Sequence, residues 1–353
     1  MAGRSGQGVV RLAVLGCGAV TELLHLPAAA RVPGLEVVSL VDRDLVRARR
    51  VAERYRVPDA RTGLELGDTR VDAVLVALPN RLHAPVSIDF LRRGVAVLVE
   101  KPMALSSAEG RAMVEAAGEG NAVLQVAQMK RFAHGARLVK DLLDAGRLGT
   151  LTDFTVEWGE DFGWPLASGS SMSPDEAGGG VLVDFGSHLL DLLCWWLGFP
   201  SVVRYADDNR GGVEADCELE LTMRGDVGTV PGEVRFSRLR TLSNVVRIRG
   251  ERLTVEWDHM TADAVRILPT DWKDGAPPRF SWTEHDGQTF EDLFVRQLES
   301  FVDAVGTGPP SLVPGESVLP SLELIERCYR CRGRLEEPWD RPVGMPDAAE
   351  VGA

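Results

Sequence analysis

The sequence has few of the features that mark membrane or secreted proteins. No apolar run approaches the roughly 20 residues that a membrane-spanning helix requires. The longest run, 189–199, is short and contains Asp191. The first eight residues are polar and lack the apolar region of a secretory signal. We therefore expect a cytoplasmic protein with no membrane partner.

Positive charge is scarce as well. The 39 Lys and Arg residues face 52 Asp and Glu residues, so the formal net charge is −13. This balance argues against a nucleic-acid partner, which requires a basic surface, and it is compatible with small-molecule chemistry. Only four of the basic residues are lysines, so a lysine inside a motif is informative; they are Lys101, Lys130, Lys140 and Lys273.

Cysteine is also sparse, with five residues spread along the chain. A few scattered cysteines are typical of a reducing compartment. Cys328 and Cys331 form a CxxC pair, but no second pair and no nearby histidine completes a zinc-binding set. Because the pair lies in an apolar helical pattern, we interpret both thiols as packed helix residues and predict no metal site.

The first third of the chain alternates continuous apolar runs with helical patterns. The predicted strands span 9–15, 35–41, 71–78, 95–99 and 122–127, and the predicted helices span 19–31, 44–55, 84–93 and 106–118. Apolar strands separated by helices are typical of parallel strands buried on both faces. This part of the chain is therefore predicted to be an α/β Rossmann domain with a doubly wound parallel sheet.

Beyond residue 150 the strands follow one another without helices between them. They are predicted at 151–158, 217–223, 227–236, 244–249, 253–257 and 264–268, with covering helices at about 180–197, 290–305 and 316–332. This order predicts an α+β domain with a large, mostly antiparallel open sheet. A length of 353 residues agrees with two domains.

The predicted domain boundaries follow from this change of pattern. A dinucleotide-binding domain is expected over 9–130 and a substrate-binding and oligomerisation domain over 131–337, with flexible tails at 1–8 and 338–353. The alternating strands leave one face of the second sheet without cover from this chain. We therefore expect that face to be buried in a homodimer or homotetramer.

A glycine-rich turn, Gly16-Cys17-Gly18-Ala19-Val20, follows the first predicted strand. Gly16 permits a tight turn, and Gly18 lets the backbone approach a pyrophosphate at the start of the next helix. Thr21 stands where the full fingerprint has a third glycine, which makes the motif weak when taken alone. Its position between a strand and a helix favours a dinucleotide site.

Asp42 and Arg43 follow the second predicted strand, 24 residues after Gly18. A carboxylate at this place accepts hydrogen bonds from the adenosine ribose and repels a 2′-phosphate, which favours NAD. A guanidinium stacks on adenine or holds a 2′-phosphate, so NADP stays open. The alternative interpretation of the pair is a solvated turn.

Two further groups of residues are candidates for the active site. Glu100-Lys101-Pro102 follows the strand at 95–99, at the edge of the sheet where ligands bind in open α/β folds, although a surface lysine after a strand is the simpler alternative. Gly178-Gly-Gly180 opens a predicted helix on which Asp184, His188 and Asp191 fall within about 60° of one another. An aspartate that merely holds a histidine four residues later is a common structural pair, and this alternative stays open.

Taken together, these motifs resemble the Gfo/Idh/MocA oxidoreductases, which include glucose–fructose oxidoreductase and inositol dehydrogenase. The Leu78-Pro79-Asn80-x-x-His83 segment after the strand at 71–78 is a fourth matching piece, and the resemblance covers residues 9 to 332. It implies a nicotinamide cofactor bound by the Gly16–Val20 turn, Asp42, Arg43, the 78–83 segment, Glu100 and Lys101. It also implies that Lys101, Asp184 and His188 form the catalytic set.

Alcohol oxidation suits these residue types. An imidazole such as His188 accepts a hydroxyl proton near neutral pH, and Lys101 can stabilise the developing alkoxide. We expect NAD-dependent oxidation of a secondary alcohol on a sugar, an aminosugar or a cyclitol. The alternatives are an NADPH-dependent ketosugar reductase, an NAD-dependent glycosidase and a non-catalytic cofactor-binding regulator.

The segment 159–176 reads as a long polar loop that leads into the predicted catalytic helix. Long loops inside compact domains are usually functional, so we expect it to border the substrate. Trp164 can stack on a sugar ring, and carboxylates such as Asp175 can pair with an ammonium group of an aminoglycoside-like substrate. The simpler alternative is a solvated acidic loop.

Overall fold

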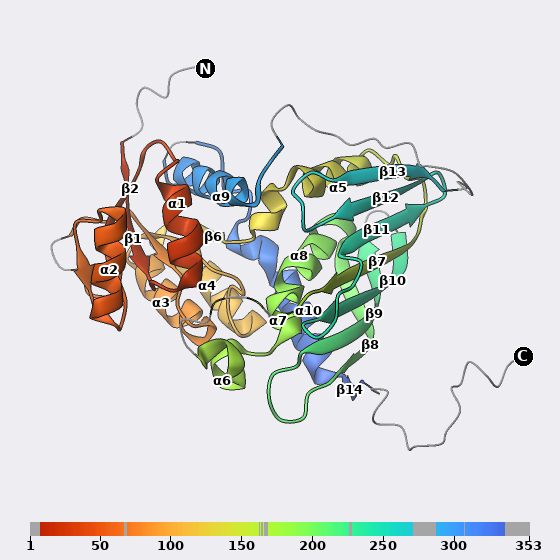
Figure 1. Ribbon diagram of the computed structural model, residues 1–353. Helices are drawn as coiled ribbons and strands as arrows, with labels where there is room; N and C mark the ends of the chain where they lie inside the picture. Colours follow the sequence, from red (N-terminus) through yellow and green to blue (C-terminus); the bar gives the residue numbers. More distant parts are fainter. Residues whose placement is uncertain are drawn as a thin grey trace, which may run out of the picture.

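The computed structural model describes residues 8–66, 69–161, 163, 165, 169–225, 228–270, 287–306 and 308–335. Two sheets lie on opposite sides of the molecule, and a layer of helices packs between them (Figure 1). The N-terminal part of the chain forms the first sheet, and the following part forms the second. The candidate site is built where the two parts meet.

The first sheet is parallel throughout. Its six strands run in the order β3-β2-β1-β4-β5-β6. They are β1 (Val10–Leu15), β2 (Leu35–Val41), β3 (Ala60–Arg61), β4 (Ala73–Val76), β5 (Ala96–Val99) and β6 (Leu124–Val126). The order reverses between β1 and β4, and ligands bind at such a switch point beyond the carboxyl ends of the strands. The predicted Rossmann domain is confirmed, and the short edge strand β3 is an addition.

Helices cover both faces of this sheet. They are the π-helical turn η1 (Thr21–His25), α1 (Leu26–Ala29), α2 (Leu45–Tyr55), η2 (Asn80–Leu82), α3 (His83–Arg92), α4 (Ser107–Gly120) and η3 (Met129–Phe132). The predicted helix at 19–31 thus begins with a wide turn. Asp44 caps α2 by accepting from Val46 and Arg47, and Ser106 caps α4 by accepting from Glu109.

The second sheet has eight strands in the order β13-β12-β11-β7-β10-β9-β8-β14. They are β7 (Leu151–Gly159), β8 (Phe199–Asp207), β9 (Asp216–Gly225), β10 (Gly228–Ser237), β11 (Val245–Gly250), β12 (Leu253–Asp258), β13 (Val265–Pro269) and β14 (Arg332–Arg334). Only β7 with β10 and β8 with β14 pair in parallel, so the mostly antiparallel prediction is confirmed. β8 was not predicted, because its Pro200 interrupts the strand signal.

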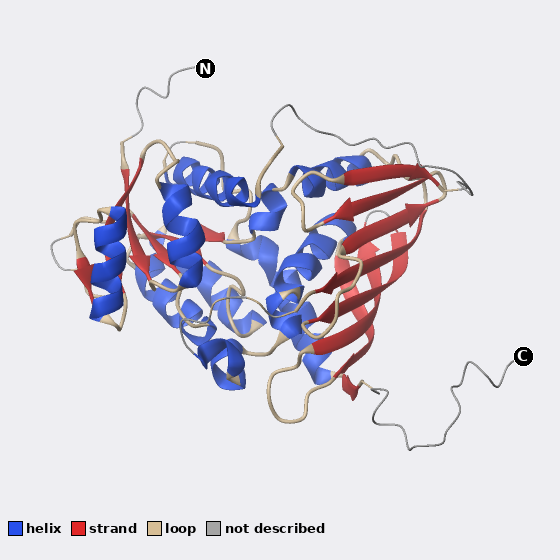
Figure 2. Cartoon of the chain, viewed as in Figure 1, coloured by secondary structure: helices blue, strands red, loops and turns tan. Residues whose placement is uncertain are grey.

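The helices of this part gather on the face of the sheet that is turned toward the first sheet (Figure 2). They are α5 (His134–Asp144), η4 (Gly169–Met172), α6 (Pro174–Ala177), α7 (Val181–Asp184), α8 (Gly186–Leu197), α9 (Phe290–Val305), η5 (Gly315–Val318) and α10 (Leu319–Arg330). α9 packs on α1, and α10 packs on both α4 and α8. The α10 helix therefore joins the two parts of the fold.

One predicted helix differs from the observed structure. The segment 180–197 forms two helices, α7 and α8, with a break at Phe185. The Ser187 hydroxyl donates to the Val183 carbonyl, and such side-chain bonds bend helices. No single described helix is long and apolar enough to cross a bilayer; only the bent pair Pro174–Asp184 and Gly186–Leu197 reaches that limit when taken together.

The prediction that both thiols of the CxxC pair are packed in a helix is right for Cys328 and wrong for Cys331. Both thiols are free; Cys328 is buried in α10, whereas Cys331 ends the helix and is exposed. A helix terminus frays into solvent, so the apolar pattern stops before the second cysteine.

Candidate active site

The glycine turn lies between β1 and the first helix, at the switch point of the parallel sheet. Gly16 has φ +101°, and a Cβ there would lie 2.1 Å from the Ala77 carbonyl oxygen, so only glycine fits. Thr21, in place of the third glycine, donates to the Gly16 carbonyl at 2.7 Å and ties the turn together. A Cβ on Gly18 would meet no atom within 4 Å. The turn thus faces open space at a helix start, which fits a dinucleotide pyrophosphate.

Asp42 directly follows β2 and is buried beside this turn. Its Oδ2 accepts the Cys17 N–H at 2.9 Å, and its Oδ1 accepts the Asp44 N–H at 2.9 Å. Arg47 Nη1 lies 3.4 Å from Oδ2, whereas Arg43 is exposed. The carboxylate therefore links the turn to the end of β2, where a ribose would bind.

The segment after β4 contacts the second part of the chain. Asn80 Nδ2 donates to the Ala177 carbonyl at 2.9 Å. His83 is buried, with one ring nitrogen 2.7 Å from the Pro102 oxygen and the other 2.8 Å from the Leu78 oxygen. Burial lowers the pKa of His83. Its ring thus holds the 78–80 turn beside the turn that follows β5, and we propose that it acts on the cofactor through that placement.

Glu100 holds the backbone of Lys101 through a hydrogen bond. Its Oε1 lies 2.6 Å from His25 Nε2, and its Oε2 accepts the Lys101 N–H at 3.0 Å. Burial acts to raise the pKa of Glu100, but the bond with His25 and the nearby positive charges outweigh it and lower the pKa. The ionised carboxylate thus fixes the backbone at the base of the lysine.

Lys101 and Asp184 form an ion pair between the two parts of the chain. Lys101 Nζ lies 2.5 Å from Asp184 Oδ1, and Arg238 Nη2 donates to Asp184 Oδ2 at 2.6 Å. Partial burial acts to raise the pKa of Asp184, but the charges of Lys101 and Arg238 outweigh it and lower the pKa well below its usual range. Asp184 is therefore an anchor for the lysine and a weak base.

His188 lies on α8 and is buried, and its Nδ1 has no hydrogen-bond partner within the described part of the chain. Its ring centroid lies 6.0 Å from that of Trp158, which in turn stacks on Phe185 at 4.1 Å. Burial, together with the positive charges of Lys101 and Lys130, lowers the pKa of His188 well below its ordinary value. The imidazole is neutral at pH 7 and suited to accept a proton.

Glu214 fixes the start of α7 and so the position of Asp184. Its Oε1 accepts the N–H groups of Gly180 at 2.8 Å and Leu182 at 3.1 Å, and the Tyr329 hydroxyl at 2.7 Å. A Cβ on Gly180 would lie 1.9 Å from the Glu214 carbonyl oxygen. This close approach explains why the glycine-rich segment precedes the helix.

Asp191 was placed by helical spacing on the face shared by Asp184 and His188, but it belongs to another contact. It forms a buried two-bond ion pair with Arg131, with both distances 2.7 Å. Arg131 also donates to Ser317. This carboxylate therefore joins η3, α8 and η5.

The predicted substrate loop is described in part. Trp164 lies outside the described residues. Asp175 is exposed on α6, and Glu176 accepts from Arg81 at 2.7 Å. The loop acids therefore include one that an arginine of the first domain already holds.

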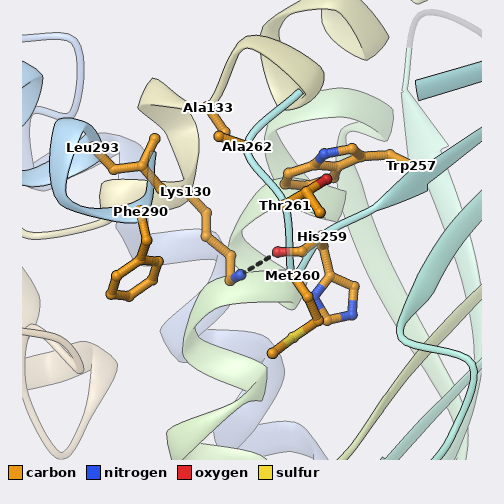
Figure 3. A pocket seen from close by; sticks show the side chains of 9 residues that line it. All are labelled: Lys130, Ala133, Trp257, His259, Met260, Thr261, Ala262, Phe290 and Leu293. Carbon is orange, nitrogen blue, oxygen red and sulfur yellow. Dashed lines mark hydrogen bonds between the residues drawn. The ribbon is translucent and has the colours of Figure 1, made fainter. Parts of the chain in front are cut away.

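Sequence reasoning missed Arg238, Lys130, Trp158 and Glu214. Lys130 is buried beside Trp158. Its Nζ donates to the His259 carbonyl at 2.7 Å (Figure 3). The scarcity of lysine was the one available signal for it. Arg238, Trp158 and Glu214 lie in strands or loops, and the sequence pattern does not show which other segments these contact.

Comparison with known proteins gives family matches over both parts. Residues 10–128 match the oxidoreductase family with an NAD-binding Rossmann fold, and residues 136–256 match the Gfo/Idh/MocA C-terminal domain. A levoglucosan dehydrogenase in complex with NADH has the same fold, with a TM-score of 0.80 at 18% identity over 91% of this chain and 96% of that one.

Two curated relatives align with part of the chain. An Amycolatopsis mediterranei protein, provisionally named a UDP-kanosamine synthase oxidoreductase subunit, is 32% identical over 57% of this chain and 56% of its own length. The D-glucoside 3-dehydrogenase of Escherichia coli is 31% identical over 55% of each chain. The chain thus spans a little over half the length of these relatives. With both domains matched, it belongs to the Gfo/Idh/MocA oxidoreductase family and carries that family's NAD-binding Rossmann domain.

Proposed function

We propose that the chain oxidises a secondary alcohol of a sugar, aminosugar or cyclitol, with NAD as the hydride acceptor. The observation that supports this proposal is the Lys101–Asp184 ion pair, 2.5 Å long, which lies beyond the carboxyl end of β5 and within electrostatic reach of His188. Bound NAD would supply the hydride chemistry. The Gly16–Val20 turn, Asp42 and the 78–80 turn would hold it.

The described side chains supply the remaining steps. His188 accepts the proton of the substrate hydroxyl, because burial and the nearby lysine charges keep its imidazole neutral. Lys101 donates to the oxygen as negative charge develops on it. Asp184 keeps the ammonium in place and, together with Arg238, is positioned to meet a neighbouring hydroxyl.

The neutral form of His188 is the one that alcohol oxidation requires, because a protonated imidazole cannot accept the hydroxyl proton. A ketosugar reductase requires a proton donor at neutral pH, whereas burial and the two lysine charges hold this imidazole in its neutral form. Reduction with NADPH is the reverse of the same chemistry and the principal alternative outcome.

A screen of alcohols separates these possibilities. Neutral sugars, aminosugars and cyclitols are incubated with NAD or NADP, and reduced nicotinamide is followed by absorbance. We expect reduction of NAD with at least one sugar or cyclitol alcohol. No reduction with any alcohol, together with NADPH consumption by a ketosugar, would replace the dehydrogenase proposal by the reductase.

The aminosugar part of the proposal has its own test. The name of the Amycolatopsis relative and the exposed Asp175 support an ammonium-bearing substrate. An amino-substituted sugar is then compared with its hydroxyl analogue at two salt concentrations. A lower KM for the amine that weakens as salt rises indicates an ammonium–carboxylate contact, and equal KM values at both salts remove it.

We also propose that the second sheet mediates a homodimer or homotetramer. Its outer residues include paired charges such as Arg235 and Glu218, which lie opposite each other on β10 and β9. No described helix covers that face (Figure 2). Light scattering at micromolar concentration tests this, and a monomer would contradict it.

A further inference from the structure

Lys130 is a buried lysine beside the proposed base. It lies in η3, is 4% exposed, and its Nζ is 4.6 Å from the ring centroid of Trp158. The same ring lies 6.0 Å from the ring of His188. The Lys130 ammonium and the His188 imidazole therefore lie around one tryptophan ring, and the charge of the ammonium acts on the imidazole.

No carboxylate of the described residues pairs with this ammonium within 4 Å. Its one hydrogen-bond acceptor there is the His259 carbonyl oxygen, at 2.7 Å, so two of its three N–H bonds are available. A buried charge without an ionic partner is costly, and ligands can supply the missing partner.

The charged groups around Lys130 act from a greater distance. Glu160, after β7, and Asp258, at the end of β12, favour its charged form, and Lys101 opposes it. His259 and His188 are neutral because burial lowers the pKa of each, that of His259 to about 3. Burial dominates this balance and lowers the pKa of Lys130 to about 7.

The pocket around Lys130 has one charged member. The nine residues that line it come from η3, the end of β12, the turn that follows and α9, and eight of them are uncharged (Figure 3). Met260 and Phe290 of this lining are exposed, at 44% and 42%. The cavity is small, about 10 Å³, which is room for one water-sized group, so it admits one oxygen of an anionic group and leaves the carbon skeleton outside.

We propose that Lys130 is a specificity-determining residue that receives a carboxylate group of the substrate. The proposal rests on the proposed function, in that the ligand is a sugar derivative, and it replaces the aminosugar by a sugar acid as the expected substrate. The charge it selects is opposite to that predicted from the acidic loop at 159–176.

The experiment measures equilibrium binding by calorimetry, with NADH-loaded protein. D-glucuronate is the probe, with D-glucose and D-glucosamine as its neutral and cationic counterparts. Wild type, Lys130→Met and the control Lys140→Met are compared at pH 6.0 and 8.5. Lys140 is a matched control because it pairs with Asp144 on α5, away from the pocket.

We expect wild type and Lys140→Met to bind glucuronate at least about tenfold tighter than glucose at pH 6.0, since a hydrogen bond to a charged group has that strength. The preference shrinks at pH 8.5, because Lys130 loses its proton as pH rises through about 7. Lys130→Met abolishes it. Equal binding of glucuronate and glucose at pH 6.0, tighter binding of glucosamine, or a preference that survives in Lys130→Met would overturn the proposal.

These measurements distinguish a failure of the carboxylate proposal from a failure of the dehydrogenase proposal. A glucuronate preference that depends on Lys130, without oxidation of any alcohol, leaves the carboxylate site standing and removes the dehydrogenase. Oxidation of neutral sugars without that preference does the reverse.

Discussion

Lys101 Nζ lies 2.5 Å from Asp184 Oδ1, and the two residues come from different parts of the fold. Lys101 follows β5 of the parallel sheet, whereas Asp184 ends α7, which packs on β9 and β10 of the second sheet. Glu100 holds the backbone N–H of Lys101, and Arg238 holds the second carboxylate oxygen of Asp184. The pair is therefore assembled only when the two parts are docked.

The first prediction concerns this pair. Lys101→Ala should lower kcat by about 10²–10⁴, because a charge that stabilises the alkoxide is lost. Asp184→Asn should lower it by less, because the amide still accepts a hydrogen bond from the ammonium. The double variant should be no slower than Lys101→Ala, since the two act as a unit. Steady-state kinetics on all three variants measures this, and additive losses would contradict the paired role.

The second prediction concerns His188. His188→Ala should lower kcat by about 10²–10⁴, because the proton acceptor is lost, and should leave NADH affinity nearly unchanged. Since the pKa of His188 is well below its ordinary value, its own titration should leave the wild-type rate flat above neutral pH. Kinetics and fluorescence titration of NADH provide both readouts. Turnover close to wild type in His188→Ala would show that another group is the base.

The third prediction concerns the choice of cofactor. Wild type should bind NADH more tightly than NADPH, because the Asp42 carboxylate repels a 2′-phosphate. In Asp42→Ser the ratio of the two dissociation constants should shift about tenfold or more toward NADPH, because a like-charge contact is removed and Arg43 and Arg47 remain. Fluorescence titration with both nucleotides gives the ratio directly. Tighter NADPH binding by wild type would refute the assignment.

The fourth prediction concerns acid stability. Burial lowers the pKa of His259 from 6.5 to about 3, so the unfolded chain binds an extra proton between these values. Its contribution to stability is complete above pH 6.5 and is lost as pH falls toward 3; at pH 5 the loss is about 2 kcal/mol. In His259→Gln the drop in unfolding free energy between pH 7.5 and 5 should be smaller by that amount. Urea titrations at both pH values test it, and an unchanged drop would assign the acid sensitivity to other groups.

The residues that could be predicted are those fixed by local pattern. Gly16, Asp42 and Lys101 follow strands, so an ordered parallel sheet places them at one edge without further information. Asp184 and His188 were found because the spacing on a helical segment brings them together, although the helix breaks at Phe185 between them.

The residues that could not be predicted depend on contacts between segments that are far apart in the sequence. Arg238 reaches Asp184 because β10 pairs in parallel with β7, an exception within a mostly antiparallel sheet. Asp191 shares a helix face with His188 by spacing, but spacing does not reveal that Arg131, 60 residues away in the sequence, pairs with its carboxylate. Trp158 alternates like any strand residue, and its contact with Lys130 is a tertiary one.

The docking of the two parts also has a consequence for heat inactivation. The Lys101–Asp184 contact spans the seam between the parallel sheet and the second sheet, and one cluster of buried apolar side chains continues across that seam, from β1 and β2 into α8, β9 and β10. Because the two sheets share this core, they should unfold together in one cooperative transition. Activity and structure should therefore be lost at the same temperature, and substitutions that improve packing across the seam would stabilise the whole enzyme.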